Sequence, residues 1–203
     1  MPLMRRADLA MAICIGLWPA AGSCQQPGDG MAIRPDDERR LAAYHAAAGK
    51  ALLEAFSGGD AADLTILAEV LKGDALPPDD ALAILKGEWS CRTIKMGRLL
   101  PIVVYQPFRY RTGPDGSLEK LTGSQHTRGT IYRDGDRLVY LGTGFVAGDD
   151  PPPYAELPPF SATADPQRVP EVGLVEITGP NRGRVMFPDP HLESRFNILV
   201  LNR

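Results

Sequence analysis

The sequence predicts an α+β fold in which short N-terminal helices precede a mainly antiparallel eight-strand β-barrel or a strongly curved meander sheet. Up to residue 86, apolar residues recur at three- and four-residue steps, which is typical of amphipathic helices. After Gly87 the apolar period becomes two, which is typical of strands. Asp134-Gly135 lies between two β-rich runs and indicates a tight hairpin. Successive strands should therefore pair as antiparallel neighbours, and closure into a barrel would remove exposed edges.

The length and composition fit one globular domain. The 203 residues are 44% apolar and 23% charged, and the 21 Gly and 19 Pro residues stay below the level typical of low-complexity disorder. The formal net charge of −3 leaves no excess of positive charge for a phosphate backbone. Nucleic-acid binding is therefore not expected.

Residues 1–23 have the layout of a secretory signal peptide. Arg5 and Arg6 precede an apolar run from Leu9 to Ala21, which is shorter than the roughly 20 residues of a membrane-spanning helix. Ala21-Gly22-Ser23-Cys24 resembles a bacterial lipobox, in which the cysteine is acylated, but the same small residues suit ordinary signal-peptidase cleavage. We expect an exported protein that is periplasmic or tethered to the outer membrane through Cys24, with membrane contact only through that lipid.

The mature chain begins with a polar tether over 24–34 and a helical layer over 35–86. A first helix is expected from Asp36 to Phe56, because its apolar residues form one stripe that ends before Gly58 and Gly59. A second should run from Asp60 to Leu71, with Asp60 as its N-cap. Pro78 is placed to begin a third helix, which should extend through Leu85.

Residues 87–203 are expected to form the barrel. Eight strands are predicted, at 88–96, 102–111, 117–124, 128–133, 137–144, 172–178, 184–187 and 195–201. Alternation along the second strand places Ile102, Val104, Phe108 and Tyr110 on one face. The Pro-rich stretch 148–170 cannot be interior strand, because proline donates no ladder hydrogen bond, and it is interpreted as a loop or lid over one end.

Charge is shared unevenly along the mature chain. Residues 25–86 hold six basic and eleven acidic side chains, whereas residues 87–147 hold nine basic and five acidic ones. Either the acidic helices dock on the first strands, or a basic barrel mouth attracts an anionic ligand. Docking is favoured, because short helices with a single apolar stripe need a partner surface.

Two resemblances bear on the fold. Gly87-Glu88-Trp89 resembles the Gly-x-Trp opening of lipocalins and other calycin barrels, which implies that Trp89 closes the barrel and that Arg203 or Arg195 packs across its ring. Over nearly its full length the chain resembles the domain of unknown function 4893 family of bacterial envelope proteins. That second resemblance rests on motifs that include Trp89-Ser90-Cys91-Arg92, Glu119-Lys120-Leu121-Thr122-Gly123-Ser124-Gln125 and Tyr140-Leu141-Gly142, and it implies no activity.

No constellation of residues indicates catalysis, a metal site or a cofactor. His45, His126 and His191 lie far apart in the sequence, and none has metal-ligand spacing to Cys or another His. Ser124 and His126 lack a nucleophile elbow, and neighbouring Glu119 and Lys120 should face opposite ways. An enzyme is the third and weakest hypothesis. Cys91 is expected to be a small buried hydrophobe.

The first hypothesis is a non-enzymatic binding protein for a hydrophobic or amphipathic small molecule held inside the barrel. The expected lining is Trp89, Phe108, Tyr110, Ile131 and Val139, with the Pro-rich loop as a lid. The alternative is that these residues are core, because small barrels are often filled by their own side chains. A second hypothesis is a protein-interaction module that contacts an envelope protein or inhibits a protease, in which residues 25–35 would be the active segment.

Overall fold

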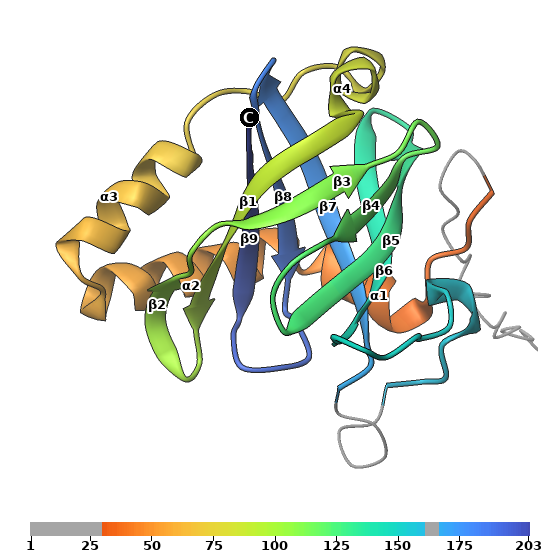
Figure 1. The fold of residues 1–203 in the computed structure, drawn as a ribbon. Helices are drawn as coiled ribbons and strands as arrows, with labels where there is room; N and C mark the ends of the chain where they lie inside the picture. The colour runs from red at the N-terminus through yellow and green to blue at the C-terminus, as the bar shows by residue number, and fades with distance from the viewer. Residues whose placement is uncertain (1–29, 161–166) are drawn as a thin grey trace, which may run out of the picture.

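The structure is a computed structural model that describes residues 30–160 and 167–203. The predicted signal peptide and Cys24 lie outside the described residues. Four helices come first, and the strands that follow wrap into a barrel, with the helices packed around its outside and over one end (Figure 1). None of the described helices is long and apolar enough to cross a membrane.

The helical layer contains one more helix than the sequence predicts. The helices are α1 (Pro35–Ala42), α2 (Tyr44–Gly58), α3 (Ala61–Val70) and α4 (Pro78–Leu85). The predicted first helix is divided at Ala43, whose backbone leaves helical geometry. The physical reason is packing: α1 contacts strand β7 (Val169–Gly179), whereas α2 contacts β1 (Gly87–Gly97), and one straight helix would not follow both.

The strands form one antiparallel sheet that closes on itself. They are β1, β2 (Leu100–Val104), β3 (Phe108–Thr112), β4 (Ser117–Lys120), β5 (Gln125–Asp134), β6 (Arg137–Val146), β7, β8 (Arg182–Pro188) and β9 (Phe196–Asn202). Neighbours pair in the order β2-β1-β3-β4-β5-β6-β7-β8-β9, and β1 also pairs with β9. This confirms the α+β class and the eight-strand barrel, with one additional strand.

The additional strand arises because the predicted strand 102–111 is broken. β2 pairs with the second half of β1 and β3 with the first half, and residues 105–107 between them include Pro107. The break changes which face the side chains occupy. Ile102 and Val104 pack outside the barrel beneath α2, whereas Phe108 and Tyr110 belong to the barrel interior, so the predicted common face is wrong.

Three apolar clusters hold the layers together. The interior cluster includes Trp89, Tyr110 and Tyr140 and extends to Leu85 of α4. A second cluster joins α2 and α3 to the outside of β1, β2, β8 and β9. A third, the α1 cluster, joins Ile33 and Leu41 to the outer face of β6 and β7. Alternate residues of each strand therefore serve the inside and the outside.

The acidic helices dock on basic strands through ion pairs as well as apolar contacts. Glu54 of α2 binds Arg195 at 2.7 Å and accepts a hydrogen bond from the backbone N–H of Arg98 at 2.8 Å. Asp79 of α4 accepts from Arg133 at 2.5 Å. The Asp79–Arg133 pair joins the acidic segment 25–86 to the basic segment 87–147, so the uneven charge reflects, at this position, contact between the two layers.

The end of the predicted tether belongs to the folded body. Ile33 is fully buried in the α1 cluster, and the Arg34 guanidinium donates to the carbonyls of Leu157 at 3.0 Å and Pro158 at 2.8 Å. These partners lie in the Pro-rich loop, beyond the short helix η1 (Tyr154–Glu156). The described part of the Pro-rich loop before residue 161 therefore runs along the α1 side of the barrel. In this part of the loop, Phe160 stacks on His191 with ring centroids 4.1 Å apart.

Candidate functional site

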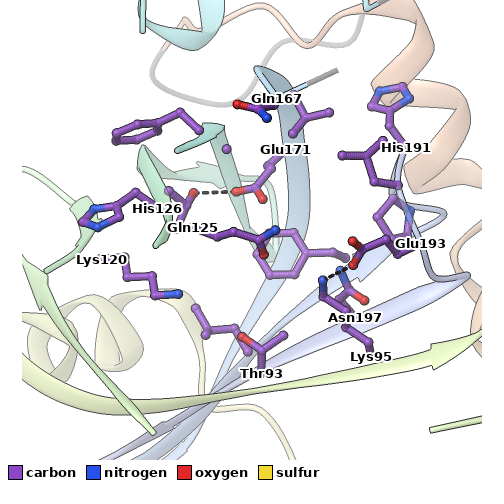
Figure 2. A pocket seen from close by; sticks show the side chains of 18 of the residues that line it. Thr93, Lys95, Lys120, Gln125, His126, Gln167, Glu171, His191, Glu193 and Asn197 are labelled. Atoms are coloured by element: carbon purple, nitrogen blue, oxygen red, sulfur yellow. Dashed lines mark hydrogen bonds and ion pairs between the residues drawn. The ribbon is translucent and has the colours of Figure 1, made fainter. Parts of the chain in front are cut away.

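A cavity of about 580 Å³ occupies one end of the barrel (Figure 2). It is lined by the second half of β1, the first residues of β5, β7 and β9, and the last residues of β6 and β8. Tyr105 and Phe108, on either side of the break in the second strand, also line it. Such a volume is within the range of pockets that hold small molecules.

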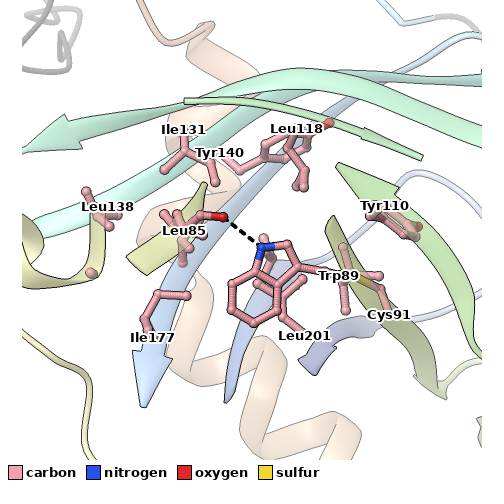
Figure 3. Packing of buried hydrophobic residues seen from close by; sticks show 14 of the residues in the cluster. Leu85, Trp89, Cys91, Tyr110, Leu118, Ile131, Leu138, Tyr140, Ile177 and Leu201 are labelled. Carbon is pink, nitrogen blue, oxygen red and sulfur yellow. Dashed lines mark hydrogen bonds between the residues drawn. The ribbon is translucent and has the colours of Figure 1, made fainter. Parts of the chain in front are cut away.

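The opposite end of the barrel is filled by its own side chains (Figure 3). Trp89 donates from its indole N–H to the carbonyl of Leu85 at 2.7 Å, and α4 lies across this end. The Arg203 guanidinium lies 3.7 Å from the centroid of the Trp89 ring and donates to the carbonyls of Leu85 and Lys86. This is the packing that the Gly-x-Trp resemblance implies, with Arg203 in the basic position, whereas Arg195 binds Glu54.

Aromatic and aliphatic side chains form much of the cavity wall. Phe108, Tyr110, Phe145, Phe187 and Leu199 all line it. The Tyr140 ring packs edge-on against Phe187, with centroids 5.9 Å apart, and separates the cavity from the filled half. This wall suits the apolar part of a ligand.

A half-buried carboxyl group, that of Glu171 on β7, faces the cavity. The Thr127 hydroxyl donates to Glu171 Oε2, and the Tyr140 hydroxyl lies 2.5 Å from the Thr127 oxygen. Because Thr127 uses its proton on the carboxyl, Tyr140 donates to Thr127. Burial raises the pKa of Glu171 and raises the pKa of Tyr140 well above its usual value.

Glycines of β5 and β6 provide the space for this hydrogen-bonded chain. A Cβ at Gly144 would lie 2.9 Å from Glu171 Oε1, and one at Gly142 would lie 2.2 Å from the Tyr140 hydroxyl. Gly129, which is paired with Gly142, would meet the Tyr140 ring at 2.7 Å. Side chains at these positions would displace the tyrosine or the carboxyl group.

Lys120 of β4 brings a positive charge into the same cavity. Its side chain is 8% exposed, and its Nζ lies 4.0 Å from the centroid of the Phe108 ring. Within the described part of the chain, this ammonium has no hydrogen-bond acceptor and no ion-pair partner. Burial lowers the pKa of Lys120.

The other cations of the cavity are already paired. Lys95 binds Glu193 at 2.6 Å. Arg40 binds Asp37 at 2.7 Å and also donates to the carbonyls of Pro170 and Pro188. Lys120 therefore differs from both in facing the cavity with its charge uncompensated by a contact.

The histidines stand apart from one another in the fold. The His126 ring nitrogen Nε2 lies 2.8 Å from the carbonyl oxygen of Gly123, and His45 packs edge-on against Tyr44. His191 stacks on Phe160, and burial lowers its pKa. Among the described residues, no three His, Cys, Asp or Glu side chains come together as a metal site.

The residues proposed from the sequence as ligand-lining are divided between the two halves of the barrel. Phe108 and Tyr110 line the cavity, whereas Trp89 and Ile131 belong to the filled half. Val139 lies outside, in the α1 cluster, because it is adjacent to the inward-facing Tyr140 and so points the other way. Its placement in the lining was therefore wrong.

Sequence reasoning missed the polar groups of the cavity. Glu171 lies on the same face of β7 as Val175 and Ile177, which point into the barrel. Lys120 lies on the same face of β4 as Leu118, which also points into the barrel. A charged residue on an otherwise apolar strand face is the signal that could have identified both. Glu119 and Lys120 do face opposite ways: Glu119 is outside, 3.2 Å from Arg128.

Comparison with known proteins supports one assignment. No curated protein and no solved structure matches the chain. A family model described as a domain of unknown function, DUF4893, matches residues 31–201, a span that includes every helix and nearly all of the last strand. The chain belongs to the DUF4893 family.

Proposed function

We propose that this protein is a non-enzymatic binding protein that holds a small amphipathic molecule in the open half of its barrel. The observation that carries the proposal is the contrast between the two halves. One is packed around Trp89, whereas the other retains about 580 Å³ lined by aromatic rings and by charged side chains. A barrel that needed only a core would be expected to fill both halves.

The chemistry of the lining supports an amphipathic rather than a purely apolar ligand. Phe108, Tyr110 and Phe187 offer apolar contact area. Lys120 is buried and Glu171 is half-buried, and both can carry a charge, which is costly to remove from water unless something compensates it. A ligand with a polar end can supply that compensation, while its apolar part covers the rings.

The proposal is tested by fluorescence titration with N-phenyl-1-naphthylamine, a neutral apolar probe that brightens when water is excluded. Gln125 lines the cavity from the start of β5 (Figure 2), so Gln125→Trp should fill the space and weaken binding about tenfold or more. Lys50→Trp, on the exposed side of α2, is the control for an added indole and should bind like the parent protein. Absence of binding to the parent, or equal binding by the two variants, would refute a ligand site in the cavity.

We also propose that the protein is exported and tethered by an acyl group on Cys24. The basic residues, apolar run and lipobox-like Ala21-Gly22-Ser23-Cys24 support this, together with a folded body that begins only a few residues later. The intact mass of protein from the membrane fraction tests it. A diacylglycerol-sized increment on a chain that starts at Cys24 is expected, and an unmodified chain with a nearby start would instead indicate ordinary cleavage.

A further inference from the structure

The cavity holds two groups of opposite charge, the buried Lys120 and the half-buried Glu171, and neither is in an ion pair within the described residues. Other interior or rim charges of the cavity are paired, as Lys95 is with Glu193. Lys120 rests on the Phe108 ring, and Glu171 is held by the Thr127 hydroxyl. Both line the same space from different strands, Lys120 from β4 and Glu171 from β7 (Figure 2).

Each group has hydrogen-bonding capacity that the protein leaves unused. The ammonium of Lys120 has three N–H donors and no acceptor among the described residues. Glu171 uses Oε2 for Thr127, whereas Oε1 lies against Gly144, the position where a Cβ would intrude to 2.9 Å. A donor and an acceptor without hydrogen-bond partners among the described residues therefore face one cavity, and their opposite charges attract each other across it.

We propose that the polar end of the ligand carries both a hydrogen-bond acceptor, which Lys120 binds, and a hydrogen-bond donor, which Glu171 binds. Neutral carboxamides and zwitterionic amino-acid head groups share this chemistry. The inference rests on the proposed binding function, which it extends by naming the class of head group.

Ligands with only one kind of polar group match the cavity less well. A fatty carboxylate would satisfy Lys120 but would bring a second negative charge toward Glu171. An alkylamine would satisfy Glu171 but would meet Lys120, with Lys95 and Arg40 also lining the cavity. An ester has acceptors and no donor, so the Glu171 carboxylate would lose water without gaining a partner.

A panel of compounds that share a ten-carbon chain and differ in the head group tests the inference. Decanamide, 2-aminodecanoic acid, decanoate, decylamine and methyl decanoate would each be titrated against the full chain carrying N-phenyl-1-naphthylamine, and displacement of the probe measured. We expect decanamide or 2-aminodecanoic acid to bind about tenfold tighter than the other three, and the stronger of these two identifies the neutral or the zwitterionic class.

Variants then assign the selectivity to the two side chains. Lys120→Met and Glu171→Gln should each remove about tenfold of the affinity for the preferred compound while leaving probe binding in place. Lys72 and Glu69 form an exposed ion pair on α3 and the turn after it, so Lys72→Met and Glu69→Gln provide matched controls that should change nothing.

The outcomes separate this inference from the proposed function. Equal affinity across the panel, or tightest binding of decanoate, decylamine or the ester, overturns the head-group assignment while the binding function stands. Selectivity that survives both Lys120→Met and Glu171→Gln overturns it as well. If neither the probe nor any panel compound binds the parent protein, both proposals fail together.

Discussion

Truncation of Asp37 should destabilise the protein far more than the same change at its neighbour Asp36. Both aspartates form pairs with an arginine three residues later in α1, but the pairs differ in burial. The side chains of Asp37 and Arg40 are 0% and 7% exposed, whereas those of Asp36 and Arg39 are 50% and 72% exposed. The two pairs lie on one helix, so helix propensity and dipole effects are nearly matched.

The contacts of Asp37 determine how much stability its truncation should remove. Asp37→Ala removes the 2.7 Å bond from Arg40 and the 2.6 Å bond from the Tyr154 hydroxyl, and it leaves the Arg40 guanidinium buried without a carboxylate. Breaking a buried pair in this way costs about 3–5 kcal/mol, whereas an exposed pair is worth roughly 0–1 kcal/mol. For a chain of this size, these values correspond to a fall in Tm of about 6–20 °C for Asp37→Ala and of at most about 4 °C for Asp36→Ala.

Urea unfolding and thermal melts of the two variants measure the difference. A double variant, Asp37→Leu with Arg40→Met, gives a second test, because replacing both partners with apolar groups should recover much of the loss. The reasoning is refuted if Asp37→Ala and Asp36→Ala have equal midpoints. It is also refuted if the double variant is less stable than Asp37→Ala, since that would show that the buried guanidinium is not the source of the loss.

Three other predictions concern single side chains of the barrel and its helices. Gly142→Ala should cost about 1–3 kcal/mol in denaturant unfolding because its Cβ would meet the Tyr140 hydroxyl, whereas Gly49→Ala, with open space in α2, should stabilise by about 0.5–1 kcal/mol; the opposite ranking would contradict the packing. Burial raises the pKa of Glu171, so its contribution to stability is present at low pH and is lost as the pH rises through that raised pKa. Glu171→Gln should therefore gain stability relative to the parent as the pH rises above about 4, and a gain confined to low pH would be inconsistent with this sign. Cys91 should resist iodoacetamide in the native protein and react on unfolding, as followed by peptide mass, because burial raises the pKa of its thiol; rapid native alkylation would argue against that burial.

The architecture could be predicted from the sequence because its signals are local. The change of apolar period at Gly87 marks the boundary between helices and barrel, and the hairpin predicted at Asp134-Gly135 joins β5 to β6, with Gly135 and Asp136 as its turn residues. The break before Phe108 is harder to predict, because Pro107 is the one residue that interrupts a run otherwise typical of a single strand. The division of the first helix at Ala43 carries no sequence signal, because it follows from the two surfaces on which α1 and α2 pack.

The candidate site could be predicted only in part because it depends on contacts between distant strands. Thr127 and Glu171 are 44 positions apart, and they meet only when β5, β6 and β7 pair in one register. Phe108 and Tyr110 were accessible to pattern reasoning as aromatic residues of a barrel strand. Which half of the barrel stays open, however, depends on how Trp89 and α4 fill the other half, and alternation along single strands does not contain that information.

The separation of β2 from β3 also bears on self-association. Because β2 leaves the line of β3, it pairs only with β1 within the described part of the chain, and its outer edge could in principle accept a strand from another molecule. The edge is short and contains Pro101, which has no N–H to offer. The end of α2 lies against that proline, so closely that a Cβ at Gly58 would be 2.9 Å from its ring. The protein can thus keep an unpaired strand edge at β2 without presenting a template for intermolecular sheet growth.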